Sequence, residues 1–372
     1  MINYILLILA FLFSALCGFI SIPMILNFCK EKRLYDIPNT RKIHHNAVPR
    51  LGGISFLPSM LLAFIATIFA FSDYTDSEKI TLSTWTVSFF VSLMLIYSVG
   101  IVDDLIGLGA KTKFSVQIIA ASLMPAACLV LNNFYGFLGV YEVPFYIGAP
   151  LTAFIIVFII NAINLIDGID GLAAGLSLIA LGGFLVCFIS EEVWLYGILI
   201  SGLMGVLIPF LYFNLWGNPE KNRKIFMGDS GSLSLGFILA FLAVKFSMDN
   251  PNVMFWRPDC LLLSYSFLIV PVFDVIRVSM VRLFHHTPIF RADKNHIHHK
   301  LMRAGMSQHQ TLFCILGLAV IYIALNIMLN EFLSSTVIVV IDIAVWIVFH
   351  LLVDVFIRKM GNNVFLVNKD NE

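Results

Sequence analysis

Long apolar segments alternate with short polar ones along almost the whole chain. Eleven of the apolar segments have about the length that a helix needs to cross a bilayer. Lipid offers no water partners to backbone polar groups, so a spanning segment of this kind must be helical. We place the spans near residues 3–28, 52–71, 84–102, 114–132, 149–166, 172–190, 193–214, 231–248, 260–283, 311–330 and 334–356. The pattern therefore predicts an all-α polytopic membrane protein.

The connections between the spans allow more local predictions. A tight turn is expected at Ser190, Glu191 and Glu192, because spans lie directly on both sides. Residues 137–147 are rich in Tyr, Phe and Val, which favours a short β-hairpin at the membrane interface. The first apolar segment has neither a basic region before it nor a small-residue cleavage site, so we expect a retained helix. Nothing suggests a soluble domain, and residues 1–372 are interpreted as one integral-membrane domain.

The composition supports this class of protein. The 372 residues are 59% hydrophobic and 12% charged, whereas soluble domains are about one quarter charged. The formal net charge is zero, so the sequence lacks the basic surface that nucleic-acid binding requires. Six cysteines lie in or beside apolar segments without paired spacing. They indicate neither a disulfide framework nor a metal cluster.

The basic residues indicate how the chain is oriented. Twenty of the 23 Lys and Arg residues fall in residues 29–51, 103–113, 215–230, 277–310 and 357–372. Cytoplasmic loops of membrane proteins carry an excess of Lys and Arg. We therefore expect these segments to be cytoplasmic, with the N-terminus outside and the C-terminus in the cytoplasm.

Polar segments that resemble sites of chemistry all fall on that predicted cytoplasmic face. They are residues 36–53, 102–113, 161–174, 226–232 and 291–299. Charged groups at the end of a membrane span need a partner, a cation or a water-filled cavity. The sequence therefore predicts one site, built from cytoplasmic loops, for a substrate presented at the membrane surface.

Carboxylates dominate this predicted site. They are Asp103, Asp104, Asp167, Asp170 and Asp229. Crowded carboxylates repel one another unless protons or a cation neutralise them. Oxygen ligands of this kind suit Mg²⁺, with Mn²⁺ as the alternative, and Asn161 offers a neutral amide oxygen.

Groups that favour phosphate lie beside the carboxylates. Arg50, Lys111, Lys113, Arg291 and Lys294 carry the positive charge. The Gly- and Ser-rich segment around Asp229 leads into a predicted helix N-terminus, which is a favourable phosphate environment. Carboxylates, a divalent ion and basic groups together suggest phosphoryl transfer on a nucleotide substrate. The histidines His296, His298 and His299 could bind a metal, transfer protons or bind a phosphate, and the basic residues around them favour the phosphate role.

Several of these signals also have purely structural interpretations. Asp103 and Asp104 could be a solvated helix end. Gly52 and Gly53 suit close helix packing as well as they suit a turn that faces phosphate. Asp274 and Arg277, three residues apart, are interpreted as an ion pair inside the bundle.

Taken in order, five motifs resemble those of one known family. They are DIPNTRKIHHNAVPRLGG, VDDLIGLGAKTK, NAINLIDGIDGLAAG, FMGDSGSLSLG and RADKNHIHH. The chain resembles the polyprenyl-phosphate N-acetylhexosamine-1-phosphate transferases of glycosyltransferase family 4, over about residues 30–310. It resembles in particular the bacterial undecaprenyl-phosphate GlcNAc-1-phosphate transferases, which begin cell-envelope glycans. Ile297 interrupts the three consecutive histidines of the muramyl-pentapeptide branch and argues against that donor.

The resemblance implies a reaction and its partners. A UDP-N-acetylhexosamine, most simply UDP-GlcNAc, reacts with undecaprenyl phosphate to give undecaprenyl-diphospho-sugar and UMP, with Mg²⁺ as cofactor. GalNAc, FucNAc and QuiNAc remain alternative sugars. The resemblance further implies a multi-pass protein of the bacterial inner membrane, and a homodimer is an alternative to a monomer.

The resemblance also suggests a role for each site residue. It associates Asn161 and Asp229 with the metal. It implies catalytic roles for Asp103, Asp104, Asp167, Asp170, His296, His298 and His299. It implies that the substrate is bound by Arg50, Lys113, Asn164, Gly168, Asn214, Phe226 and Arg291. Asn214 is expected near the uridine.

Other mechanisms and functions stay open at this point. The lipid phosphate could attack the donor directly, or an aspartate could act first as a nucleophile in a double displacement. A secondary transporter is the competing class, but it predicts charge near the bilayer centre and inverted repeats. A phosphotransferase that uses a CDP-activated alcohol is a further alternative, and DGLAAGLS does not match its expected motif.

Overall fold

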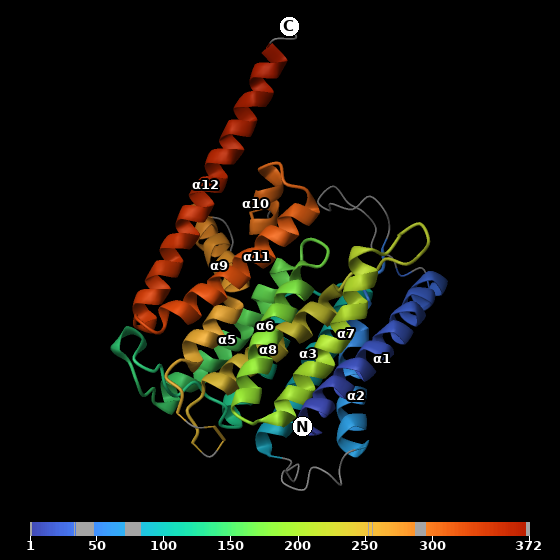
Figure 1. Ribbon diagram of the computed structural model, residues 1–372. Coiled ribbons are helices and arrows are strands. Elements are labelled where there is room, and N and C mark those ends of the chain that lie inside the picture. Colours follow the sequence, from blue (N-terminus) through green and yellow to red (C-terminus); the bar gives the residue numbers. More distant parts are fainter. Residues whose placement is uncertain are drawn as a thin grey trace.

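The computed structural model consists of helices and the loops that join them (Figure 1). It describes residues 2–32, 34, 48–70, 83–251, 253–254, 256–286 and 295–369, with side chains up to residue 359. The α-helices are α1 (Ile2–Lys32), α2 (Phe56–Ala70), α3 (Thr84–Ile106), α4 (Ala110–Ala126), α5 (Phe145–Ile166), α6 (Leu172–Ser190), α7 (Trp194–Leu215), α8 (Gly228–Ser247), α9 (Cys260–Phe284), α10 (Ile297–Arg303), α11 (Gln308–Leu329) and α12 (Ser335–Lys369). Two short 3-10 helices, η1 (Gly52–Ser55) and η3 (Phe137–Gly139), complete the described elements.

Ten of the described helices are long and apolar enough to cross a membrane. The chain is a multi-pass membrane protein. The predicted span at 114–132 corresponds to α4, which has 17 residues and is not among the ten. The start of α1 and the end of α12 lie at opposite ends of the bundle (Figure 1), while the side of the membrane that each end faces stays a prediction.

Helix α8 forms the centre of the bundle. The apolar part of this helix is buried along its whole length, and it packs against α3, α5, α6 and α9. Small residues at some of its contacts permit this close packing, because a position without a large side chain lets a neighbouring backbone approach. A Cβ atom on Gly236, for example, would lie 2.7 Å from the Cα of Ile160 in α5. The chain therefore presents the first residues of α8 at one end of a tightly enclosed helix.

Two sequence-based predictions about connections have different outcomes. The tight turn is confirmed: α6 ends at Ser190, α7 begins at Trp194, and Glu192 turns the chain with a φ of 59°. The hairpin predicted for residues 137–147 is wrong. Residues 137–139 form η3, and the antiparallel pairing there is one bridge between Asn133 and Glu142. The chain enters α5 directly after Pro144, since the apolar residues that follow satisfy their backbone groups best in a helix.

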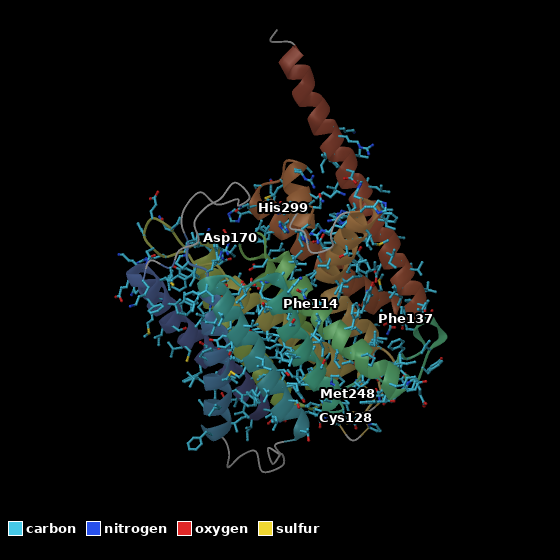
Figure 2. The ribbon with its side chains drawn as sticks, turned by 180° about the vertical axis from the view of Figure 1, so that it is seen from behind. Phe114, Cys128, Phe137, Asp170, Met248 and His299 are labelled. Atoms are coloured by element: carbon cyan, nitrogen blue, oxygen red, sulfur yellow. The ribbon has the colours of Figure 1, made fainter. Side chains whose placement is uncertain are left out.

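The six cysteines are all free, as predicted from their spacing. Asp170 and His299 lie towards one end of the bundle, and Cys128 and Met248 lie towards the other (Figure 2). Two of the polar segments from the sequence therefore share an end. We refer to it as the polar end of the bundle.

Candidate active site

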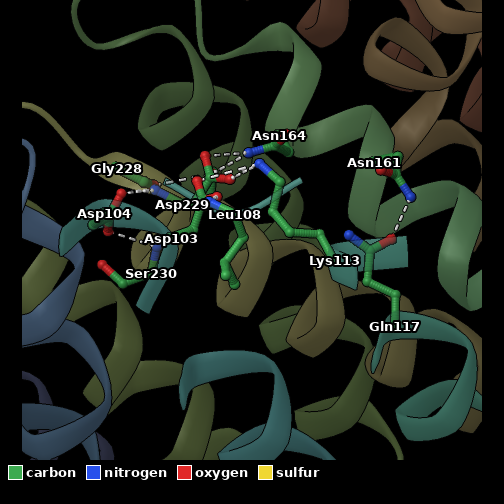
Figure 3. Close-up of polar contacts among 11 residues, drawn as sticks. Asp103, Asp104, Leu108, Lys113, Gln117, Asn161, Asn164, Gly228, Asp229 and Ser230 are labelled. Carbon is green, nitrogen blue, oxygen red and sulfur yellow. Dashed lines mark hydrogen bonds and ion pairs between the residues drawn. The ribbon is translucent and has the colours of Figure 1, made fainter. Parts of the chain in front are cut away.

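Three carboxylates meet at the polar end, where the last turn of α3 lies beside the first turn of α8 (Figure 3). Asp103, Asp104 and Asp229 each offer an oxygen, and these oxygens all lie within 4.8 Å of one another. The close approach of the two helices depends on Gly100, where a Cβ atom would lie 2.5 Å from the Cα of Ser230. The packing of α3 on α8 therefore creates the crowding of negative charge that the sequence suggested.

Asp104 stabilises the start of α8. Its Oδ1 accepts a hydrogen bond from the backbone N–H of Asp229 at 2.7 Å, and its Oδ2 accepts one from the N–H of Ser230 at 2.9 Å. These N–H groups have no partner within the helix, and the helix dipole favours a negative charge at this end. The chain enters α8 through Gly228, whose φ is 73°. Asp104 thereby holds the backbone of Asp229 in place.

Lys113, in the first turn of α4, joins the other two carboxylates. Its Nζ lies 2.6 Å from Oδ2 of Asp229 and 3.2 Å from Oδ2 of Asp103. The backbone N–H of Leu108 donates to Oδ1 of Asp103 at 2.6 Å. One ammonium group therefore offsets part of the negative charge of the carboxylates and ties α4 to α3 and α8.

The structure places Asn164, and not Asn161, beside the carboxylates (Figure 3). The Nδ2 of Asn164 donates to Oδ1 of Asp229 at 3.0 Å and to Oγ of Ser232 at 2.8 Å. The Nδ2 of Asn161 instead donates to Oε1 of Gln117 at 2.6 Å. Residues three apart on a helix differ by about 60° in direction and about 4.5 Å in height, which is enough to separate the two amides. Asn164 is therefore the amide in contact with Asp229, and the association of Asn161 with a metal stays a prediction.

Gly52 and Gly53 serve close packing in the structure. Their N–H groups donate to the carbonyl oxygens of Phe226 and Met227 at 3.0 and 2.8 Å. A Cβ atom on Gly53 would lie only 2.0 Å from the backbone N of Gly231. The segment that contains Arg50 is thus held directly against the segment that leads into α8. Phe226, an expected substrate contact, uses its backbone N–H and carbonyl oxygen in this pairing.

The loop after α5 forms a second group of charges. Asp170 pairs with Lys224 from the α7–α8 loop, with 2.7 Å between Oδ2 and Nζ. Burial, and then the charges of Asp229, Asp170 and Asp104, raise the pKa of Asp167 to about 7, whereas Arg50 lowers it. Asp167 thus lies within electrostatic range of both groups of charges.

Asn214 connects two loops of the site. Its Oδ1 accepts a hydrogen bond from the N–H of Gly171 at 2.7 Å, and its Nδ2 donates to the carbonyl oxygen of Ile225 at 2.8 Å. The side chain is only 4% exposed. Both ends of the amide are committed to backbone groups, so the structure gives Asn214 a positioning role in place of the expected uridine contact.

Replacing Asn214 by alanine is expected to lower the free energy of unfolding by about 2 to 4 kcal/mol, because two buried backbone groups lose their partners. Thermal unfolding in detergent measures the effect. The matched control is Asn218→Ala, which removes an exposed hydrogen bond to the N–H of Glu220 and should change stability by less than about 0.5 kcal/mol. Equal unfolding temperatures for the two variants would contradict the positioning role.

The histidine motif lies on and just before α10, and Asp274 of α9 holds it. The Nδ1 of His296 lies 2.7 Å from Oδ2 of Asp274, whose Oδ1 accepts the N–H of Ile297 at 2.9 Å. Arg277 pairs with the same carboxylate at 2.9 Å, which confirms the predicted ion pair. This fully buried aspartate therefore sets the start of α10, a role that spacing along the chain did not reveal.

His298 packs against the loop that carries Asp167 and Asp170. A Cβ atom on Gly168 would lie 2.1 Å from its Nε2. Burial, with a contribution from His299, lowers the pKa of His298 to about 3, so this imidazole is neutral at pH 7. Both of its ring nitrogens are buried without a hydrogen-bond partner in the described part of the chain. The absence of a side chain at Gly168 thus makes room for His298. Arg291, another expected substrate contact, lies outside the residues that the structure describes.

The fold and the site define a class: a multi-pass membrane protein with an acidic centre and basic groups at one end of its bundle. The profile of the family described as "Glycosyl transferase family 4" matches residues 86–247. The chain is also 31% identical over 370 residues to a Bacillus subtilis protein named "Probable undecaprenyl-phosphate N-acetylglucosaminyl 1-phosphate transferase", which covers 97% of this chain and 93% of that relative. The chain belongs to glycosyl transferase family 4.

Two further relatives agree with this assignment. "Undecaprenyl-phosphate alpha-N-acetylglucosaminyl 1-phosphate transferase" of Escherichia coli is 29% identical over 328 residues, which is 86% of this chain and 81% of the relative. "Decaprenyl-phosphate N-acetylglucosaminephosphotransferase" of Mycobacterium leprae is 31% identical over 298 residues, which is 75% of this chain and 72% of the relative. The resemblance drawn from the five motifs is thereby confirmed, and the chain is a transferase.

Proposed function

We propose that the protein transfers GlcNAc-1-phosphate from UDP-GlcNAc to undecaprenyl phosphate and releases UMP. The cluster of Asp103, Asp104 and Asp229, in which Lys113 bridges Asp103 and Asp229, is the observation that carries this proposal. The names of the relatives support GlcNAc as the sugar and undecaprenyl phosphate as the lipid acceptor. The positive charge in the loops at this end supports a cytoplasmic orientation in a bacterial inner membrane, with the N-terminus outside.

A divalent ion, Mg²⁺ or Mn²⁺, fits the carboxylate group. Oxygens from three carboxylates lie within 4.8 Å of one another, and hard oxygen donors are the ligands that these ions prefer. Asp103, Asp104 and Asp229 are the residues that would hold the ion. When bound, the ion would neutralise diphosphate charge.

The residues of the chain then position two phosphates. An oxygen of the lipid phosphate forms a bond to the β-phosphorus of UDP-GlcNAc, and the bond from that phosphorus to the bridging oxygen breaks, so UMP leaves with the electron pair. Phosphate monoesters are largely ionised near neutral pH, so Asp103 need accept at most one proton. Lys113, Arg50 and Lys224 supply positive charge for the phosphate oxygens. Neutral His298 can donate one N–H to a phosphate or accept a proton.

The test uses purified protein with labelled UDP-GlcNAc, undecaprenyl phosphate and Mg²⁺. Labelled product in the lipid phase and an equal amount of released UMP are expected, and a chelator should remove both. A panel of UDP-GalNAc, UDP-FucNAc and UDP-QuiNAc measures the choice of sugar. Absence of lipid label and of UMP with every donor would exclude the transfer.

The two asparagines of α5 give a comparison within one helix. Asn164→Ala is expected to lower kcat by about a hundredfold, because the amide orients Asp229. Asn161→Ala should cost less than about tenfold, since its amide contacts Gln117 and its own helix. The measurement is the rate of UMP release at saturating donor. A larger loss of kcat in Asn161→Ala than in Asn164→Ala would support Asn161 as the metal contact.

A further inference from the structure

A polar cavity lies at the polar end of the bundle, between the end of α1 and the loop that follows α7. Its volume is about 570 Å³. Figure 1 shows the α7–α8 loop, drawn in yellow-green, beside the end of α1. None of the carboxylates of the candidate active site lines this cavity, so it is a separate feature of the molecule.

Every charged residue among the described residues that line the cavity is positive. Among its twelve lining residues are Lys30, Lys221 and Arg223, and none of the twelve is acidic. Neighbouring acids in the sequence, Glu31 and Glu220, do not line it. A cavity whose described lining carries three cations and no anion attracts a ligand that carries negative charge.

The surroundings of the cavity indicate a ligand that enters from the membrane. Tyr212 and Trp216 line one side, and both are exposed at the end of the spanning helix α7. Tyr and Trp at the end of a span lie at the level of the lipid headgroups. Lys30 is in the last turn of the spanning helix α1. Pro23 and Leu26 also line the cavity and add the apolar surface that a site for the glycerol and upper acyl part of a lipid requires.

The loop that lines the cavity is also part of the active-site frame. The Nδ2 of Asn222 donates to the carbonyl oxygen of Leu26 in α1 at 3.3 Å. The N–H of Arg223 donates to the carbonyl oxygen of Asn218 at 3.0 Å. The next residue, Lys224, pairs with Asp170. A ligand in the cavity would therefore contact a loop whose far side belongs to the candidate active site.

We propose that this cavity binds the headgroup of an anionic phospholipid such as phosphatidylglycerol. Lys30, Lys221 and Arg223 face its phosphate, and Tyr212 and Trp216 flank its glycerol region. Basic residues near a membrane surface contribute about 1 kcal/mol each to the binding of anionic lipid. The site holds a bilayer lipid and is distinct from the place where we propose that the acceptor reacts.

The test follows the fluorescence of Trp216 in the full-length protein, reconstituted in phosphatidylcholine nanodiscs. Brominated phosphatidylglycerol should quench more strongly than brominated phosphatidylcholine at an equal mole fraction. The additional quenching by brominated phosphatidylglycerol should disappear in the Trp216→Phe variant. This variant distinguishes quenching of Trp216 from quenching of the other four tryptophans. The readout needs no catalysis, so its failure is distinguishable from failure of the proposed transfer.

Paired charge variants decide the assignment. Lys221→Gln with Arg223→Gln should weaken the excess quenching by about tenfold or more. Arg358→Gln with Lys359→Gln on α12, which removes the same two charges from exposed positions, should leave it unchanged. Equal quenching by both brominated lipids, or equal losses in the two double variants, would overturn the proposal. Displacement by inorganic phosphate would identify a free anion site instead, and displacement by trace undecaprenyl phosphate would identify an acceptor site.

Discussion

Replacing Asp229 by alanine is expected to lower the rate of GlcNAc-1-phosphate transfer by about a thousandfold or more. Asp229 is the carboxylate on which the site converges: Lys113 contacts one of its oxygens at 2.6 Å, and Asn164 contacts the other at 3.0 Å. Its removal takes away a proposed ligand of the divalent ion and leaves Lys113 and Asn164 misplaced. The measurement is UMP release and lipid label across a range of Mg²⁺ concentrations.

Two comparisons separate this effect from misfolding. Asp229→Asn keeps the shape of the side chain and its contact with Asn164 but removes the charge, and it should be nearly as inactive as the alanine variant. Both variants should unfold within a few degrees of the parent protein, because the N–H groups that Asp104 caps are backbone groups and remain. Substantial transfer by Asp229→Ala at ordinary Mg²⁺ concentrations would refute the proposed role.

The second large effect is expected at Gly53, which carries no charge and packs against the start of α8. Gly53→Ala should lower the free energy of unfolding by about 3 kcal/mol and with it the yield of active protein. The new Cβ atom would lie 2.0 Å from the backbone N and 2.2 Å from the Cα of Gly231. Backbone cannot rotate away as a side chain can, so the first turn of α8 must shift. Thermal unfolding and the transfer rate report the two consequences.

Gly182 supplies the control for this prediction. It lies inside α6, and a Cβ atom there would meet nothing within 4 Å. Gly182→Ala should leave stability unchanged or raise it slightly, since alanine is a better helix former than glycine. If Gly53→Ala were as stable as Gly182→Ala but bound donor more weakly, Gly53 would face the substrate, as the alternative interpretation of the sequence held.

The residues of the site differ in how far they could be predicted. Asp103, Asp104 and Asp229 are charges at span ends, and the cost of charge in lipid makes such positions visible in one sequence. Lys224 carried no such signal, because a lysine in a basic loop is ordinary. Asp274 was visible only as the partner of Arg277, three residues away; its contact with His296 joins residues far apart in the chain.

The sequence by itself determined the membrane class, most of the helices, and the gathering of the polar segments at one end. Hydrophobic length and the distribution of Lys and Arg act locally, so they can be read without a fold. Only the tertiary structure decided which polar groups touch. It chose Asn164 over Asn161, gave Gly53 a packing role and turned Asn214 towards backbone. These contacts join segments that are distant in sequence, so they depend on how the helices pack and no local pattern encodes them.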